Sequence, residues 1–155
     1  MLDENKFIQY GFPRTQADIL GITIHETDKN DVSASGLEQW LNEENKTSAG
    51  CYHYICDDEQ VVQIMPNDWG VYHTGKALDW GNQYTISVAL CSTLSDEKYS
   101  VILNRAVDLI NALKNEYGIS DEMIFFHNSF NEKVYCPRRL LDEYKSVKRF
   151  VMEEL

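Results

Sequence analysis

Three residues that lie far apart in the sequence carry side chains suited to binding a metal ion: His25, His127 and Cys136. Each histidine follows an apolar run typical of a strand, and strand ends are where open α/β sheets place their sites. Two imidazoles and one thiolate match zinc's preferred ligands and leave a fourth tetrahedral position open. The set predicts a catalytic zinc site. The spacing leaves open a structural zinc with His53 or His73 as the fourth ligand.

The other cysteines do not suggest a second metal site. Cys51, Cys56 and Cys91 form no Cys-x-x-Cys pair, which argues against a zinc ribbon, a zinc finger or a thioredoxin-type redox site. We expect them to be small apolar residues of the core, within strands.

The strands that must position these residues follow from hydrophobic periodicity. Residues 19–25 alternate apolar and polar side chains, which predicts a strand with one apolar and one polar face. Further strands are expected at residues 84–91 and 123–126. Residues 51–56 and 60–65 are expected to form a hairpin.

Helices are predicted between these strands. One begins at Ser35, because Ser35 and Glu38 have the spacing of a capping box. A second is expected over residues 97–117, and a last one begins at Pro137, a residue favoured at a first helical position. Residues 67–83 show neither the period of a helix nor that of a strand, and they are expected to form a long ordered loop with a functional role. The alternation predicts an α/β fold, a central mixed β-sheet with helices packed on it.

Length and composition limit the classes of protein to consider. The 155 residues predict a single domain, residues 1–155, with no separate wall-binding domain. The net charge of −11 disfavours nucleic acid as a partner, because such binding depends on Lys and Arg at phosphates. No apolar run is long enough to span a membrane, and the first residues lack the pattern of a signal peptide. We expect cytoplasmic synthesis and a monomer.

Six ordered segments carry a resemblance to a known family, strongest over residues 20–150. They are Ile22-Thr23-Ile24-His25, Tyr52-His53-Tyr54-Ile55, Val71-Tyr72-His73-Thr74-Gly75, Asn82-Gln83-Tyr84-Thr85-Ile86-Ser87-Val88, His127, and Lys133 with Cys136-Pro137-Arg138-Arg139-Leu140. In this order and spacing they resemble the zinc-dependent N-acetylmuramoyl-L-alanine amidases of type 2, which include phage endolysins and share a fold with the peptidoglycan recognition proteins.

The resemblance implies a role for each matching residue. His25, His127 and Cys136 match the three zinc ligands of the family. Tyr52 and Lys133 match catalytic residues beside the metal, where they can stabilise the developing oxyanion or donate a proton. His73 and Gly75 match the segment that lines the substrate groove. By strand alternation Tyr52 and Tyr54 share one face, so His53 is expected to point away from the zinc and pack.

Two departures from the family pattern define the expected subtype. Lys133 lies three positions before Cys136 rather than two, so this loop has gained a residue. Many endolysins have a glutamate where this chain has Ala89. Members that lack this glutamate tend to carry the tyrosine, so we expect a subtype that relies on Tyr52 and Lys133.

The resemblance implies a specific reaction, the hydrolysis of the amide bond between N-acetylmuramic acid and L-alanine in peptidoglycan. A phage or prophage endolysin is expected, reaching the cell wall through a holin or cell lysis. Two alternatives remain: a non-catalytic peptidoglycan-binding module of the same fold, and a zinc peptidase that cuts within the peptide stem. The intact ligand set disfavours the first of them.

Overall fold

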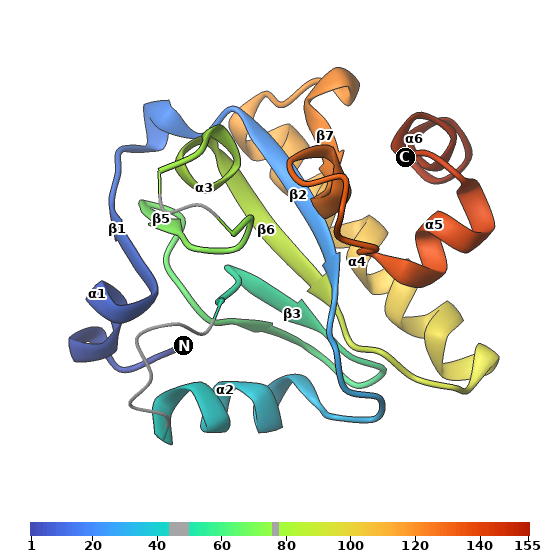
Figure 1. Ribbon diagram of the computed structural model, residues 1–155, viewed down its shortest axis with the longest axis horizontal. Helices are drawn as coiled ribbons and strands as arrows, with labels where there is room; N and C mark the ends of the chain where they lie inside the picture. Colours follow the sequence, from blue (N-terminus) through green and yellow to red (C-terminus); the bar gives the residue numbers. More distant parts are fainter. Residues whose placement is uncertain (44–49, 76–77) are drawn as a thin grey trace.

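The computed structural model describes residues 1–43, 50–75 and 78–155, and its centre is a five-stranded mixed sheet (Figure 1). The strand order is β4-β3-β6-β2-β7. The strands are β2 (Gly21–Glu26), β3 (Tyr54–Cys56), β4 (Val61–Gln63), β6 (Thr85–Leu90) and β7 (Ile124–Phe126). All neighbours are parallel except the β3–β4 hairpin. The predicted α/β architecture, its strands and its hairpin are confirmed.

One face of the sheet is apolar and packs against a long helix, α4 (Asp96–Tyr117), which lies behind the sheet in Figure 1. Ile22 and Ile24 of β2 alternate onto this face and are fully buried, as are Ile86 and Val88 of β6. The helix ends where Gly118 adopts a left-handed conformation with φ of 66°, which favours glycine.

The opposite face of the sheet carries the polar residues of the alternation, and we call it the site face. Its members are Thr23 and His25 of β2, with Thr85 and Ser87 of β6, and all are buried. The prediction of one apolar and one polar face is confirmed for β2. However, the polar face does not meet solvent, because other segments of the chain cover it.

Part of that cover comes from the segment expected to be a loop. Residues 67–83 contain a strand, β5 (Trp69–Val71), which pairs antiparallel with β1 (Gly11–Pro13), and the start of a helix, α3 (Trp80–Tyr84). The expectation of a loop without regular structure is therefore wrong, although residues 76–77 lie outside the described residues. Strand β5 escapes detection because its partner lies about sixty positions away, where no local period can reveal it.

The first helix after β2 is α2 (Ala34–Glu43), below the sheet in Figure 1. It begins one residue earlier than predicted, and the capping hydroxyl belongs to Ser33, which accepts a hydrogen bond from the backbone N–H of Gly36 at 3.1 Å. The expected capping box at Ser35 and Glu38 is therefore wrong, although the helix itself is confirmed.

The C-terminal region holds two helices where one was expected, α5 (Arg138–Tyr144) and α6 (Val147–Glu154). The break falls at Lys145, whose φ of 64° is left-handed, and the Ser146 hydroxyl caps α6 by accepting from the N–H of Arg149. Pro137 is the residue before the first helical turn and not within it. No glycine marks this break, so the sequence does not signal it.

The remaining segments are short. Before β1 come η1 (Glu4–Lys6) and α1 (Phe7–Tyr10), and further 3₁₀ turns are η2 (Gln16–Asp18), η3 (Asp121–Met123) and η4 (His127–Ser129). Cys51, Cys56 and Cys91 are free, buried thiols, as predicted, but only Cys56 lies within a strand. Among the described residues, no helix has the length and apolar character needed to cross a membrane.

Candidate metal centre

The fold brings His25, His127 and Cys136 together. Their ligand atoms lie within 4.8 Å of one another. Nδ1 of His25 lies 3.9 Å from Sγ of Cys136, and the two imidazole ring centroids are 4.6 Å apart. His25 is buried, whereas the other two are partly exposed, so solvent can reach the cluster from one side. This geometry suits a metal ion with an open coordination position.

Strand pairing explains why the two histidines meet. β2 and β7 are parallel neighbours, with Ile24 opposite Phe126. The next residue along each strand is a histidine, so His25 and His127 lie at the same level of the sheet. His127 then begins η4, which turns the chain away after placing the ring.

Cys136 is held against β2 by hydrogen bonds to Glu26. The backbone N–H of Glu26 donates to Sγ at 3.4 Å, and the carbonyl of Glu26 lies 3.7 Å from the thiol. The Glu26 carboxylate accepts from the backbone N–H of Arg139 at 2.8 Å and from the Ser92 hydroxyl at 3.0 Å. Glu26 thus fixes the start of α5 and, with it, the cysteine. Sequence reasoning missed Glu26, since nothing marked its carboxylate as buried.

His73 adjoins the cluster through His25. Its side chain is 5% exposed, and its Nδ1 lies 2.9 Å from Nε2 of His25. It contributes little surface to any groove. Gly75, two residues on, is exposed and has a φ of 96°, a left-handed conformation that favours glycine.

The two residues that match catalytic groups differ in position. The ring of Tyr52 lies 5.1 Å from that of His25, so Tyr52 adjoins the cluster. Lys133 is exposed, and its ammonium has no hydrogen-bond or ion-pair partner in the described part of the chain.

His53 lies on the site face, so the expectation that it points away from the zinc is wrong, whereas the expectation that it packs is confirmed. Strand β3 begins only at Tyr54, and strict alternation does not extend back to Tyr52. His53 is fully buried, its Nδ1 accepts from the backbone N–H of Ser87 at 3.0 Å, and its Nε2 lies 2.8 Å from the carbonyl of Trp69. Both ring nitrogens are therefore engaged in packing the site face. His53 is no part of the three-residue cluster.

Arg14 is a second residue that sequence reasoning missed. Its guanidinium donates to the carbonyls of Asn67, Gln83 and Thr85 at 2.9–3.0 Å, and so joins β1 to both ends of the segment that covers the site face. Burial lowers the pKa of Arg14 to about 10. An arginine outside any periodic element gives no signal of this role.

The electrostatics of the cluster follow from burial. Burial, with His73 and His127 nearby, holds the pKa of His25 well below 6.5, and burial also lowers the pKa of His127. Burial raises the pKa of the Cys136 thiol to about 11. Burial and the neighbouring Cys136 raise the pKa of Tyr52, so its hydroxyl stays protonated throughout the neutral range. At pH 7 the cluster holds two neutral imidazoles and a thiol.

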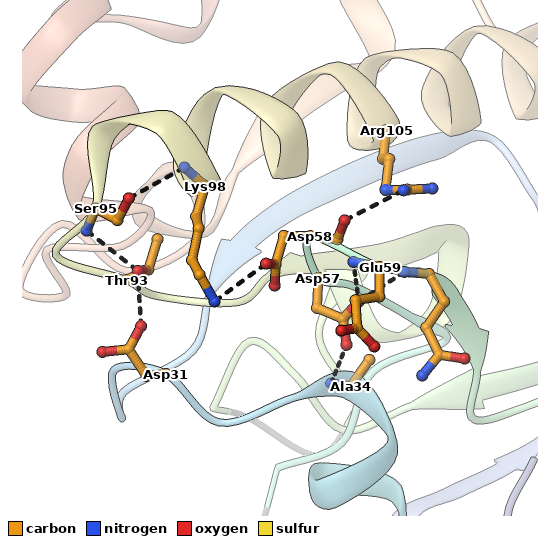
Figure 2. Close-up of polar contacts among 10 residues, drawn as sticks. Asp31, Ala34, Asp57, Asp58, Glu59, Thr93, Ser95, Lys98 and Arg105 are labelled. Atoms are coloured by element: carbon orange, nitrogen blue, oxygen red, sulfur yellow. Dashed lines mark hydrogen bonds and ion pairs between the residues drawn. The ribbon is translucent and has the colours of Figure 1, made fainter.

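A cavity of about 180 Å³ lies apart from this cluster, and Figure 2 shows that its polar groups pair with one another. Asp57 accepts from the backbone N–H groups of Ala34, Glu59 and Gln60 at 2.7–2.8 Å. Asp58 forms an ion pair with Lys98 at 3.1 Å. These contacts join the β3–β4 turn to α2 and α4, which is a structural role.

Comparison with known proteins adds independent evidence. Residues 15–139 match the family model described as N-acetylmuramoyl-L-alanine amidase. Similar proteins of Bacillus subtilis (strain 168) include the N-acetylmuramoyl-L-alanine amidases CwlA, 33% identical over 124 residues, and XlyB, 32% identical over 138 residues. The matches cover 79% and 86% of this chain but 44% and 42% of those proteins. The chain thus spans less than half the length of each.

Two solved structures also resemble this chain in sequence and in fold. PlyL is 27% identical with a TM-score of 0.83, over 97% of this chain and 92% of that one. The catalytic domain of XlyA is 26% identical with a TM-score of 0.78, over 91% and 89% of the two chains. Together with the match to the family model, which spans most of the sequence and includes all three residues of the cluster, these likenesses establish that the chain belongs to the N-acetylmuramoyl-L-alanine amidase family.

Proposed function

We propose that this protein hydrolyses the amide bond between N-acetylmuramic acid and L-alanine in bacterial peptidoglycan, with one zinc ion bound by His25, His127 and Cys136. The observation that carries the proposal is the meeting of these three ligands in a chain of this family. Endolysin-like action on the cell wall follows from the same proposal.

The donor set fits zinc. Two imidazole nitrogens and one sulfur are ligands that zinc favours, and three protein ligands leave one position for water or substrate. When bound, zinc supplies a Lewis acid that polarises the scissile carbonyl and activates water. A structural zinc with His53 or His73 as fourth ligand is disfavoured, because the ring nitrogens of both already have partners.

Tyr52 is the proposed proton donor. Its hydroxyl remains protonated at neutral pH because its pKa is raised, so it can donate but cannot act as a base. The same hydroxyl can stabilise the developing oxyanion. Ala89 lies opposite His25 in the β2–β6 register and has no carboxylate, so that position supplies no base, which increases the dependence on Tyr52.

Lys133 is the proposed second donor to the oxyanion. Its ammonium is unpaired among the described residues and exposed, so it is free to turn toward bound substrate. Gly75 is proposed to border the substrate groove, where the lack of a side chain allows close approach of the peptide stem. The chain is proposed to act as one catalytic unit with peptidoglycan as its partner.

Mass spectrometry of digested peptidoglycan tests the proposal. Purified protein loaded with zinc should release stems with a free N-terminal alanine and leave the lactyl group on the sugar. A Cys136→Ala variant, handled identically, is the control and should release none. Cuts within the stem would instead identify a peptidase, and binding without any cut would identify a non-catalytic module.

A further inference from the structure

The contact between His73 and His25 has a direction that the surrounding groups determine. His73 Nδ1 lies 2.9 Å from His25 Nε2, and both rings are buried. Two nitrogens at this distance form a hydrogen bond only when one carries a proton and the other does not. The direction of this bond decides which nitrogen of His25 is left to bind a metal.

The far side of the His73 ring faces a hydroxyl whose proton is already used. Nε2 of His73 lies 3.3 Å from Oγ1 of Thr85, and this hydroxyl donates to the backbone carbonyl of Gly81 at 2.8 Å. A carbonyl only accepts hydrogen bonds, so the single proton of the hydroxyl is directed there, and its oxygen can only accept from Nε2. The proton of the neutral His73 ring is therefore on Nε2, and its Nδ1 is a bare acceptor.

Because Nδ1 of His73 can only accept, the proton of their shared hydrogen bond belongs to Nε2 of His25. We propose that His73 is a positioning residue that accepts the Nε2 proton of His25 and so leaves Nδ1 of His25 unprotonated and directed toward Cys136. This Nδ1 is the nitrogen that lies 3.9 Å from the Cys136 sulfur. As far as it concerns zinc, the inference rests on the proposed function. Its statement about protons holds for the metal-free protein.

The backbone around His73 is held firmly enough for this task. The amide oxygen of Asn82 accepts from the backbone N–H groups of His73 and Thr74 at 2.8 and 3.0 Å. The main chain that carries the His73 ring is thus fixed on both sides of its Cα, and the ring is held against His25. Partners of this kind fix the tautomer and angle of a metal-binding histidine.

Nuclear magnetic resonance of the zinc-free wild-type protein, labelled with ¹⁵N in histidine, tests the proton positions without any variant. Long-range ¹H–¹⁵N correlations distinguish the two neutral tautomers. Both His25 and His73 should carry the proton on Nε2. A proton on Nδ1 of His25 would overturn the inference.

Zinc affinity, measured by competition with a chelator, tests the consequence. His73→Phe keeps a ring of similar size but removes the acceptor, and it should weaken zinc binding by about 10- to 100-fold. His73→Asn places an oxygen near the position of Nδ1 and should remain within about threefold of wild type. The melting temperatures of the zinc-free variants separate positioning from a general loss of structure.

Equal zinc affinity in wild type and a folded His73→Phe variant would overturn the positioning role. A wild-type protein that binds no zinc would contradict the proposed function instead, and the tautomers in the zinc-free protein would still decide the role of His73.

Discussion

The number of protons released when zinc binds is a sharp test of the cluster. The pKa of the Cys136 thiol is raised to about 11, and those of His25 and His127 lie below 6.5. At pH 7.5 the imidazoles are neutral, while on the order of one thiol in a few thousand is ionised. Since zinc binds the thiolate, each binding event must expel the thiol proton.

The sign and size of the effect follow directly. Releasing a proton makes binding stronger as pH rises, by about tenfold for each pH unit below the pKa of the thiol. Titration calorimetry in two buffers that differ in ionisation enthalpy counts the protons released. Water that ionises on the bound metal would add to this count, so a matched variant is needed.

Cys136→Asp supplies that control. An aspartate is already ionised at pH 7.5 and can take the third ligand position, so only the thiol proton is missing. The wild type should release about one proton more than the variant, and its affinity should rise about tenfold more per pH unit. Equal release by the two proteins would show that Cys136 is not a ligand or is ionised before zinc arrives.

Four other predictions follow from particular residues. Tyr52→Phe should keep zinc and the fold but lower kcat by on the order of 10² to 10³, measured on purified peptidoglycan, because the ring of Tyr52 adjoins that of His25 and its hydroxyl, whose pKa is raised, stays protonated and can donate. Lys133→Ala should lower kcat by a similar factor with unchanged zinc content, and a loss below about threefold would show that the longer loop has removed this lysine from catalysis. Asp57→Ala removes an acceptor of three backbone N–H groups, so it should lower the free energy of unfolding in urea by about 3 kcal/mol with little change in zinc affinity. The buried histidines His25, His53 and His73 have pKa values well below 6.5, so below that pH the unfolded chain binds more protons than the folded chain. The unfolding free energy of the zinc-free protein should therefore fall as pH drops below about 6.5, by up to about 4 kcal/mol per pH unit. Equal stability at pH 7.5 and 5.5 would contradict the last of these.

The part of the fold that the sequence predicts is the part governed by local periodicity. Strands β2 and β6 and helix α4 each carry a period of their own, and β7 is a short apolar run, so the two histidines at strand ends follow from local patterns. Neighbouring parallel strands then bring His25 and His127 to one level. The approach of Cys136 depends on Glu26, a contact 110 positions apart that no local pattern contains.

The position of Tyr52 shows where alternation fails. Period-two reasoning assumes that a strand extends through the residue in question. Here β3 begins at Tyr54, which faces away from the site, and His53 lies on the site face with Ile55, yet Tyr52 adjoins His25 as well. The break between α5 and α6 at Lys145 is similar, because a left-handed residue other than glycine leaves no mark in the sequence.

The burial of the site face explains why its metal ligands need partners from distant segments. A polar strand face normally meets water, which satisfies its hydrogen bonds, but here the segment around β5 and α3 excludes water, so protein groups such as His73 at Nε2 of His25 must replace those bonds. The main chain of the covering segment needs partners as well. Arg14 binds its carbonyls at Asn67 and Gln83, and Asn82 binds two of its N–H groups. These bonds involve polar side chains, which a hydrophobic period does not reveal. This same exclusion of water keeps the imidazoles neutral, so the cover also prepares the site to bind a metal ion.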